Sequence, residues 1–298
     1  MRDRWVLALL ISIILAGASF FFFLGSLMRN LTPSASSGNI AVVEVMGGIF
    51  DPKDTQTTLR DLRDDKDVRA VIVRIDSPGG SIGASQEIYE SIRLLKEIKP
   101  VIVSMGSVAA SGGYYVALPA SRILANPGTV TGSIGVRMET VNTEDLLAWM
   151  KVKPLTLKSG ALKDAGSLTR AMTSEEKSYL EDVLAKMHLQ FKKAVSENRH
   201  LDLSRVDALA DGRIFTGEEA LAQGLIDELG GFETAIRVAG EMAGLKEKPT
   251  IYYPEEESHP WVERLFDGFA EGVLKNIRTS FSGQPLFTTI RGRDGLCL

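Results

Sequence analysis

One serine of this 298-residue chain follows a predicted buried strand and opens a predicted helix, where a hydroxyl can be held as a nucleophile. Residues 101–105 form an apolar, β-branched run that is typical of a buried strand. A small-residue loop at 106–110 leads to Ser111, and Gly112 and Gly113 begin the helix. Backbone N–H groups at a helix start suit an oxyanion, and glycines let a substrate backbone come close. An ordinary N-capping serine is the alternative interpretation.

A second glycine pair can supply the partner for that oxyanion site. Gly79 and Gly80 follow a proline and a predicted buried strand at residues 68–75. If the two strands are adjacent and parallel, both of the loops that follow them lie at one edge of the sheet. The backbone N–H groups of Gly80 and Gly112 can then converge on one carbonyl oxygen.

A serine nucleophile needs a base, and no histidine lies near Ser111 in the sequence. His188 is distant and falls in a segment that predicts a structural helix. Lys163, in the run KSGALKDAGS at 158–167, is the better candidate. An amine that an apolar pocket keeps neutral accepts protons, and serine–lysine pairs are an established variant of nucleophilic catalysis. No spacing rule singles this lysine out, and an ordinary solvated surface lysine is the alternative.

Strands and helices alternate along the part of the chain that must position these residues. We predict strands at 40–45, 68–75, 101–105 and 122–125, a short extended piece at 131–136, a turn-rich loop at 76–81, and helices at 55–65, 83–98, 173–198 and 234–243, with Thr216 as a further N-cap. This order indicates an α/β fold with the chemistry in loops at the strand ends.

The composition excludes several classes of function. The chain is 44% hydrophobic and 24% charged with a net charge of −4, and it has no basic stripe, so we expect no nucleic-acid partner. The single cysteine, Cys297, allows neither an intrachain disulfide nor a thiolate cluster. The three histidines are scattered without metal-binding spacing. We therefore expect no metal and no cofactor.

The amino-terminal segment from Trp5 to Met28 contains no charged residue. As a helix it spans roughly 36 Å, enough to cross a hydrocarbon core of about 30 Å with some tilt. Two arginines precede it and one follows directly, which favours an inside amino terminus and an outward-facing main domain. A signal peptide cleaved near the small residues 16–18 is the alternative, although the apolar run continues well past them. The polar residues 30–39 are predicted to be a linker.

The carboxyl-terminal tail, residues 251–298, has a different pattern. Large apolar residues recur at every fourth position: Trp261, Leu265, Phe269, Val273, Ile277 and Phe281. This spacing predicts an amphipathic helix. The helix would pack on its own core or on a neighbouring subunit, or it would lie on a membrane surface.

Five motifs taken together resemble one known family. They are IDSPGGS at 75–81, AASGGYY at 109–115, TGSIGV at 131–136, SGALKDAGS at 159–167 and GRIFTGEEALAQGLID at 212–227. In this order they resemble the short, single-unit form of bacterial signal peptide peptidase A, over roughly residues 40–245. The resemblance implies a fold like that of Clp protease and the crotonases, here preceded by a transmembrane helix.

The resemblance also implies roles for individual residues. Ser111 would be the nucleophile and Lys163 the general base, while Gly80 and Gly112 would supply the oxyanion N–H groups. Ser133 would hydrogen-bond the lysine amine. The family forms homo-oligomeric rings in which neighbouring subunits contribute to active sites, so Lys163 could serve Ser111 of another chain.

We therefore predict a serine endopeptidase of the bacterial inner membrane, facing outward, that degrades remnant signal peptides. The predicted parts are a cytoplasmic stub and anchor at 1–29, a linker at 30–39, a peptidase domain at 40–250 and a tail at 251–298. A related protease acting on membrane-associated proteins would use the same dyad. A crotonase-type acyl-CoA enzyme or a catalytically silent scaffold could share the fold.

Overall fold

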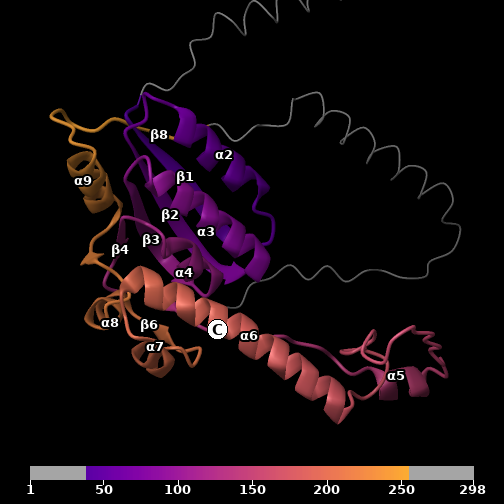
Figure 1. The fold of residues 1–298 in the computed structure, drawn as a ribbon. Helices are drawn as coiled ribbons and strands as arrows, with labels where there is room; N and C mark the ends of the chain where they lie inside the picture. The colour runs from indigo at the N-terminus through magenta and orange to yellow at the C-terminus, as the bar shows by residue number, and fades with distance from the viewer. Residues whose placement is uncertain (1–37, 255–298) are drawn as a thin grey trace, which may run out of the picture. The chain divides into compact units, whose positions relative to one another are not determined.

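The computed structural model describes residues 38–254, which form a mixed α/β unit built around parallel strands (Figure 1). Strands β1 (Ile40–Ile49), β2 (Ala70–Gly80) and β3 (Val101–Ala110) lie side by side and parallel, with β2 in the middle. Helices α2 (Lys53–Asp64) and α3 (Ile82–Lys96) make the two crossovers. The predicted α/β architecture is confirmed.

The remaining strands extend this sheet on both sides. They are β4 (Arg122–Ala125), β5 (Val130–Gly132), β6 (Ile214–Phe215), β7 (Glu228–Leu229) and β8 (Ile251–Tyr252). Two of them divide the length of β3 between them: its first half pairs with β4, and its last three residues, Val108 to Ala110, pair with β5. Consequently β5 lies beside the end of β3 from which Ser111 emerges.

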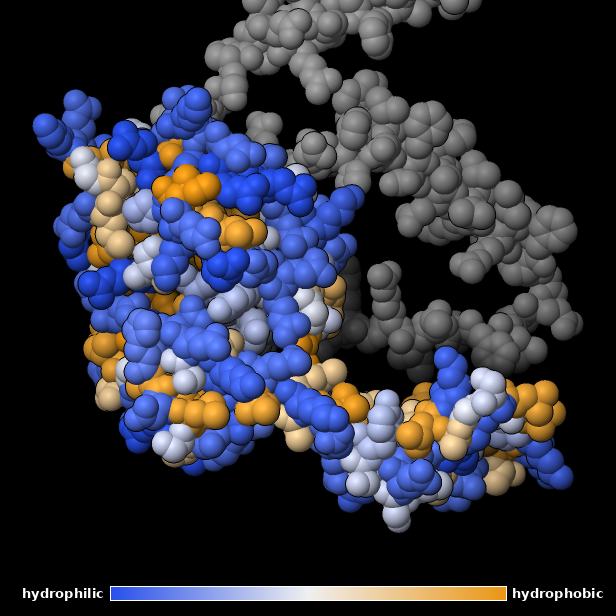
Figure 2. All heavy atoms as spheres, in the orientation of Figure 1, coloured by the Kyte–Doolittle hydropathy of each residue, from blue (hydrophilic) through white to orange (hydrophobic). Residues whose placement is uncertain are grey.

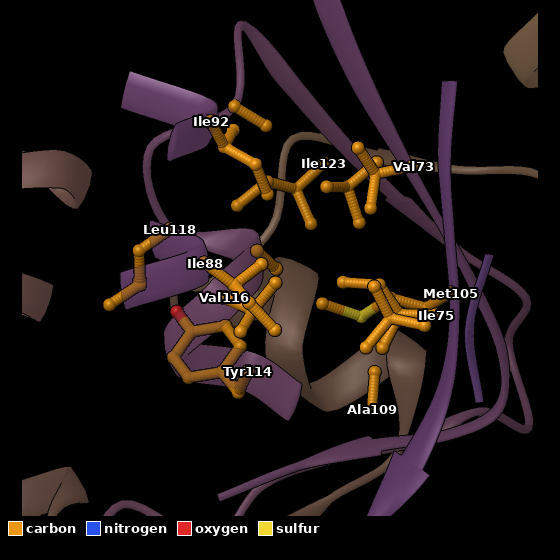
Figure 3. Packing of buried hydrophobic residues seen from close by; sticks show 14 of the residues in the cluster. Val73, Ile75, Ile88, Ile92, Met105, Ala109, Tyr114, Val116, Leu118 and Ile123 are labelled. Atoms are coloured by element: carbon orange, nitrogen blue, oxygen red, sulfur yellow. The ribbon is translucent and has the colours of Figure 1, made fainter. Parts of the chain in front are cut away.

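Helices cover both faces of the sheet. They include α4 (Gly112–Ala117), α6 (Ser174–Arg199), α7 (Leu203–Leu209), α8 (Gly217–Ala222) and α9 (Phe232–Met242), whereas α5 (Glu144–Trp149) lies apart, at the far end of α6 (Figure 1). The larger core lies between the strands and α3 and α4, with Ile75, Ile88 and Tyr114 fully buried in it (Figure 3). The smaller core lies under α9 on the other face. The Tyr114 hydroxyl donates to the carbonyl of Leu225 (2.8 Å) and so ties α4 to the segment before β7.

Two helix starts have capping boxes, of which only the cap at Thr216 was predicted. Thr216 caps α8, and its side chain and that of Glu219 form a reciprocal capping box. Thr173 and Glu176 form the same box at the start of α6. The predicted apolar face of α6 is buried only in part, because Phe191 and Val195 lie in the core whereas Leu180 is half-buried.

The two loops predicted at 76–81 and 106–110 are largely strand in the structure, so that part of the prediction is wrong. β2 continues to Gly80 and β3 to Ala110, across a register shift after Ile75. The carboxylate of Asp76 accepts the N–H groups of Ser107 and Val108, both at 3.1 Å, and thereby holds the extra residues of β3 as a bulge. Side-chain hydrogen bonds between the strands therefore hold residues with little strand propensity of their own in strand structure.

Two predicted segments lie outside the described residues. These are the helix from Trp5 to Met28 and the amphipathic part of the tail beyond residue 254. Within residues 38–254, no helix has both the length and the apolar character needed to span a bilayer.

Candidate active site

Ser111 occupies a strained turn between β3 and α4. Its backbone angles are φ 53° and ψ −119°, a region that side-chain-bearing residues adopt at a cost of about 1–3 kcal/mol. Two backbone hydrogen bonds hold it there: Ser111 N–H donates to Gly132 O (2.8 Å), and Tyr115 N–H donates to Ser111 O (2.9 Å). Its side chain makes no capping bond to α4, unlike an ordinary N-capping serine. The hydroxyl is therefore left for another partner.

The glycines of the two predicted loops meet beside this serine. A Cβ on Gly112 would lie 3.1 Å from the nitrogen of Gly80, and one on Gly79 would lie 2.5 Å from the nitrogen of Gly112. The N–H of Ser81 donates to Ile49 O of β1 (2.7 Å). Because successive N–H groups of a strand point in opposite directions, the N–H of Gly80 points away from β1, toward Gly112. The two N–H groups are thus close enough to bind one oxyanion.

Side chains that the sequence interpretation missed fix these backbones. Ser77 is fully buried, and its hydroxyl accepts the N–H of Gly79 (3.0 Å). The hydroxyl of Thr131 donates to Ala109 O (2.7 Å), next to the turn that carries Ser111. Ser77 and Thr131 lie within the motifs at 75–81 and 131–136, but nothing in their spacing indicates which backbone groups they bond.

Ser133 lies one residue beyond the carbonyl that receives the Ser111 N–H. Like Ser111 it has a positive φ, 51°, and its own N–H donates to Arg213 O (2.8 Å). The structure therefore brings Ser111, Gly80, Gly112 and Ser133 together from β2, β3 and β5.

A small apolar pocket of about 30 Å³ opens beside Ser111. It is lined by Gly80, Ile82, Ser85, Gln86, Ser111, Gly112, Tyr115, Gly135, Val136, Met187 and Phe191. Met187 and Phe191 come from α6, a helix that no sequence pattern connects with the site. The rings of Tyr115 and Phe191 meet edge to face, with centroids 5.0 Å apart.

Tyr115 is the only titratable residue among those that line this pocket, within the part of the chain described here. Burial raises the pKa of its phenol, so the group stays neutral near pH 7 and is a poor proton acceptor. Among residues 38–254 no carboxylate lines this pocket, whereas crotonase-type enzymes rely on one for proton transfer. A base for Ser111 must come from elsewhere.

Lys163 does not reach Ser111 within one chain. It lies exposed in a run of turns between α5 and α6, and it does not line the pocket. The neighbouring Asp164 is tied through Arg170 to Glu176, in the first turn of α6. Met187 of the pocket lies eleven residues further along that helix, which is about 16 Å at helical rise. Figure 1 shows α5 at the end of α6 that lies away from α4.

The described residues contain no group of three or more side chains that could hold a metal ion. What the site offers is a serine, two convergent N–H groups and an apolar pocket, the parts needed to attack and stabilise an acyl group.

Comparison with known proteins assigns this arrangement to a class. The model of peptidase family S49 matches residues 93–246. A protein of Synechocystis sp. that carries a protease name is 38% identical over 263 residues, covering 83% of this chain and 95% of its own. An Enterococcus faecium protein named as a signal peptide peptidase, SppA, is 31% identical, covering 88% of this chain and 78% of its own.

The chain belongs to peptidase family S49 and is a serine protease. Protease 4 of Salmonella typhi is 37% identical over 76% of this chain, which spans 38% of that longer protein. Among solved structures, a mutant of ClpP1 from Listeria monocytogenes has a TM-score of 0.46 and 16% identity, covering 65% of this chain and 93% of its own.

Proposed function

We propose that this serine protease is a membrane-anchored endopeptidase that cleaves apolar, extended peptides with a dyad of Ser111 and Lys163. The observation that carries the proposal is the strained Ser111, beside the N–H groups of Gly80 and Gly112 and open to an apolar pocket. Remnant signal peptides, after their release from preproteins, are the substrates we propose.

In this mechanism the neutral amine of Lys163 removes the proton of Ser111 as Oγ attacks the scissile carbonyl. The N–H groups of Gly80 and Gly112 stabilise the oxyanion, and the Ser133 hydroxyl holds the amine. The lysine then gives its proton to the leaving amine, and the acyl-enzyme forms. Lys163 then removes a proton from a water molecule as the water attacks the ester carbonyl, and it returns that proton to Ser111 Oγ as the acid product leaves.

The pocket supports the proposed substrate class. A volume of about 30 Å³ and walls such as Ile82, Val136 and Met187 suit a small apolar side chain. The Enterococcus faecium relative, which is named a signal peptide peptidase, supports signal peptides as substrates. A protease acting on membrane-associated proteins would use the same site. Comparing the cleavage of signal peptides with the cleavage of membrane-associated proteins separates the two functions. A silent scaffold would leave Ser111 unreactive.

We further propose that the chain forms a homo-oligomeric ring in which Lys163 of one subunit serves Ser111 of its neighbour. Large apolar side chains are exposed over residues 138–179, which we name the arm (Figure 2). They are Met138, Val141, Leu146, Trp149, Met150, Val152, Leu155, Leu157, Leu168 and Tyr179. So much exposed apolar surface on one segment is typical of an interface. The distance of Lys163 from Ser111 within one chain supports the same arrangement.

The membrane part of the proposal rests on the sequence. The uncharged segment from Trp5 to Met28 would be the anchor, with the amino terminus in the cytoplasm and the protease on the outer face of a bacterial inner membrane. The domain boundaries after residues 29, 39 and 250 are part of this proposal. So is a fold of the Clp protease or crotonase type. Protease added outside spheroplasts should digest the catalytic domain; full protection would place it in the cytoplasm.

A mixing experiment tests the dyad. We expect a fluorophosphonate probe to label Ser111 in the solubilised full-length protein, and Ser111→Ala and Lys163→Ala each to abolish peptide cleavage. Co-assembling the two inactive variants should restore part of the activity if the dyad spans two chains. No restoration in mixed assemblies would indicate that each chain completes its own dyad. Full activity of Lys163→Ala would remove the lysine from the mechanism.

A further inference from the structure

Within one chain, apolar burial does not fix the loop that carries Lys163. The side chains of Leu155 and Leu157 are 84% and 89% exposed, and residues 155–161 are all exposed. Local turns order the loop itself: Lys163 N–H donates to Gly160 O (3.1 Å) and Ser167 N–H to Asp164 O (3.0 Å). These bonds set the shape of the loop but do not attach it to the rest of the protein.

A chain of charges attaches the loop to α6, in addition to the bonds that Thr140 and Thr143 donate to Gly166 O and Leu168 O. Lys158 Nζ lies 2.5 Å from Asp164 Oδ1, and Arg170 Nη2 lies 2.9 Å from Asp164 Oδ2. The same guanidinium donates hydrogen bonds to Glu176 from both of its terminal nitrogens, with Nη1 donating to Oε2 at 2.9 Å. Arg170 therefore bridges the residue next to Lys163 and the first turn of α6.

The helix end of this bridge is rigid. The Glu176 carboxylate also accepts the N–H of Thr173 (2.9 Å), and the Thr173 hydroxyl accepts the N–H of Glu176 (3.2 Å). Only 4% of the Glu176 side chain is exposed, against 15% for Asp164. A forked guanidinium on a buried, fully bonded carboxylate has little freedom to reorient.

We propose that Arg170 is a positioning residue for catalysis: its bridge between Asp164 and Glu176 holds the Lys163 loop on α6 and sets where the lysine is presented. The inference rests on the proposed role of Lys163. Since α6 also supplies Met187 and Phe191 to the serine pocket, one rigid helix fixes both a wall of its own pocket and the base offered to a neighbour.

The test uses the solubilised full-length protein and the variants Arg170→Gln, Arg170→Lys and Lys163→Ala. We expect Arg170→Gln to lower kcat by about 10- to 100-fold with KM nearly unchanged, because a displacement of about 1 Å in a catalytic group has that effect. Arg170→Lys can hold only one carboxylate at a time and should recover part of kcat. In hydrogen exchange, the amides of Lys163 and Ser167 should lose protection in Arg170→Gln.

Arg237→Gln is the matched control. Arg237 also bridges two carboxylates, Glu241 at 2.7 Å and Glu228 at 3.3 Å, but it lies on α9, across the sheet from the pocket. Its kcat should equal that of the wild type. Unchanged kcat in Arg170→Gln, with Lys163→Ala inactive, would overturn the positioning role and leave the dyad standing.

Two other results of this experiment are possible. If Lys163→Ala keeps wild-type activity, the proposed function fails, and the positioning role fails with it. If Arg170→Gln no longer assembles, Asp164→Asn replaces it, because that change leaves the Arg170–Glu176 pair and the cap of α6 in place. A normal kcat in an assembled Asp164→Asn protein would then refute the proposal.

Discussion

Adding one methyl group at Gly112 should disable the oxyanion site. A Cβ at this position would lie 2.5 Å from Ser85 Oγ and 3.1 Å from Gly80 N. The first distance is shorter than the contacts that Cβ atoms make in proteins. The φ angle of Gly112 is not in the left-handed region, so alanine suffers only from this crowding. Because the Ser85 hydroxyl is held by its bond to Ser81 O (2.9 Å) and the next contacts are backbone atoms, we expect the backbone of Gly112 to move and its N–H to move with it.

The expected loss is large. Removing one oxyanion donor costs about 10²–10³-fold in kcat, or about 2.7–4 kcal/mol. The structure also predicts a rescue, because Ser85→Ala removes the nearest clashing atom and leaves contacts of 3.1 and 3.2 Å with Gly80 and Gly79. The double variant Gly112→Ala/Ser85→Ala should regain at least about tenfold in kcat, a coupling that neighbouring sites can supply.

The assay is kcat on an apolar peptide, together with the affinity for a peptide aldehyde, whose adduct with Ser111 carries an oxyanion. Gly83→Ala is the control, since a Cβ at Gly83 in the first turn of α3 meets nothing within 4 Å. If Gly112→Ala keeps kcat within about threefold of the wild type, or if Ser85→Ala restores nothing, the assignment of the Gly112 N–H to the oxyanion is wrong.

Three further predictions concern single side chains. Ser111→Gly and Ser111→Ala should both be inactive, but the glycine variant should be more stable to urea by about 1 kcal/mol, because glycine tolerates φ 53°; equal stabilities would argue against strain. The bonds of Glu176 with Arg170 and Thr173 lower its pKa from 4.5 to about 2, so the stability it contributes is complete above pH 4.5 and is lost as the pH falls through 2. Glu176→Gln should therefore melt at a lower temperature than the wild type at neutral pH and at nearly the same temperature near pH 2. A difference in melting temperature that does not change with pH would show that the charge of Glu176 is not its cause. Tyr114→Phe leaves Leu225 O without its buried donor and should cost about 1–3 kcal/mol in unfolding free energy, with kcat little changed.

The sequence predicts those elements whose local pattern agrees with their final environment. Residues 122–125 were predicted to be a strand and form β4 with the same bounds, and Thr216 caps α8 as its spacing indicates. Residues 106–110 have the composition of a loop, yet they are strand, because Asp76 holds the bulge from a neighbouring strand. Local propensity cannot contain a bond made across more than thirty residues of sequence.

The candidate site divides in the same way. Gly80 and Gly112 could be brought together from the sequence, because glycine-rich ends of successive parallel strands meet at one edge of the sheet. Met187 and Phe191 could not, since helical periodicity shows which residues share a face of α6 but not what covers that face. The positive φ of Ser111 also has no sequence signal, because nothing local asks a serine to adopt it.

A serine–lysine dyad divided between two chains would also explain how the amine becomes a base. A lysine in water holds its proton near neutral pH, and only apolar surroundings make the neutral amine accessible. Within one chain Lys163 is exposed, so nothing there removes water from it. Packing against a neighbour's surface beside Ser111 would exclude that water, while the pocket itself takes the substrate side chain. The contact that positions Lys163 would thus also exclude water from its amine, and in an isolated chain Ser111 would have no base beside it.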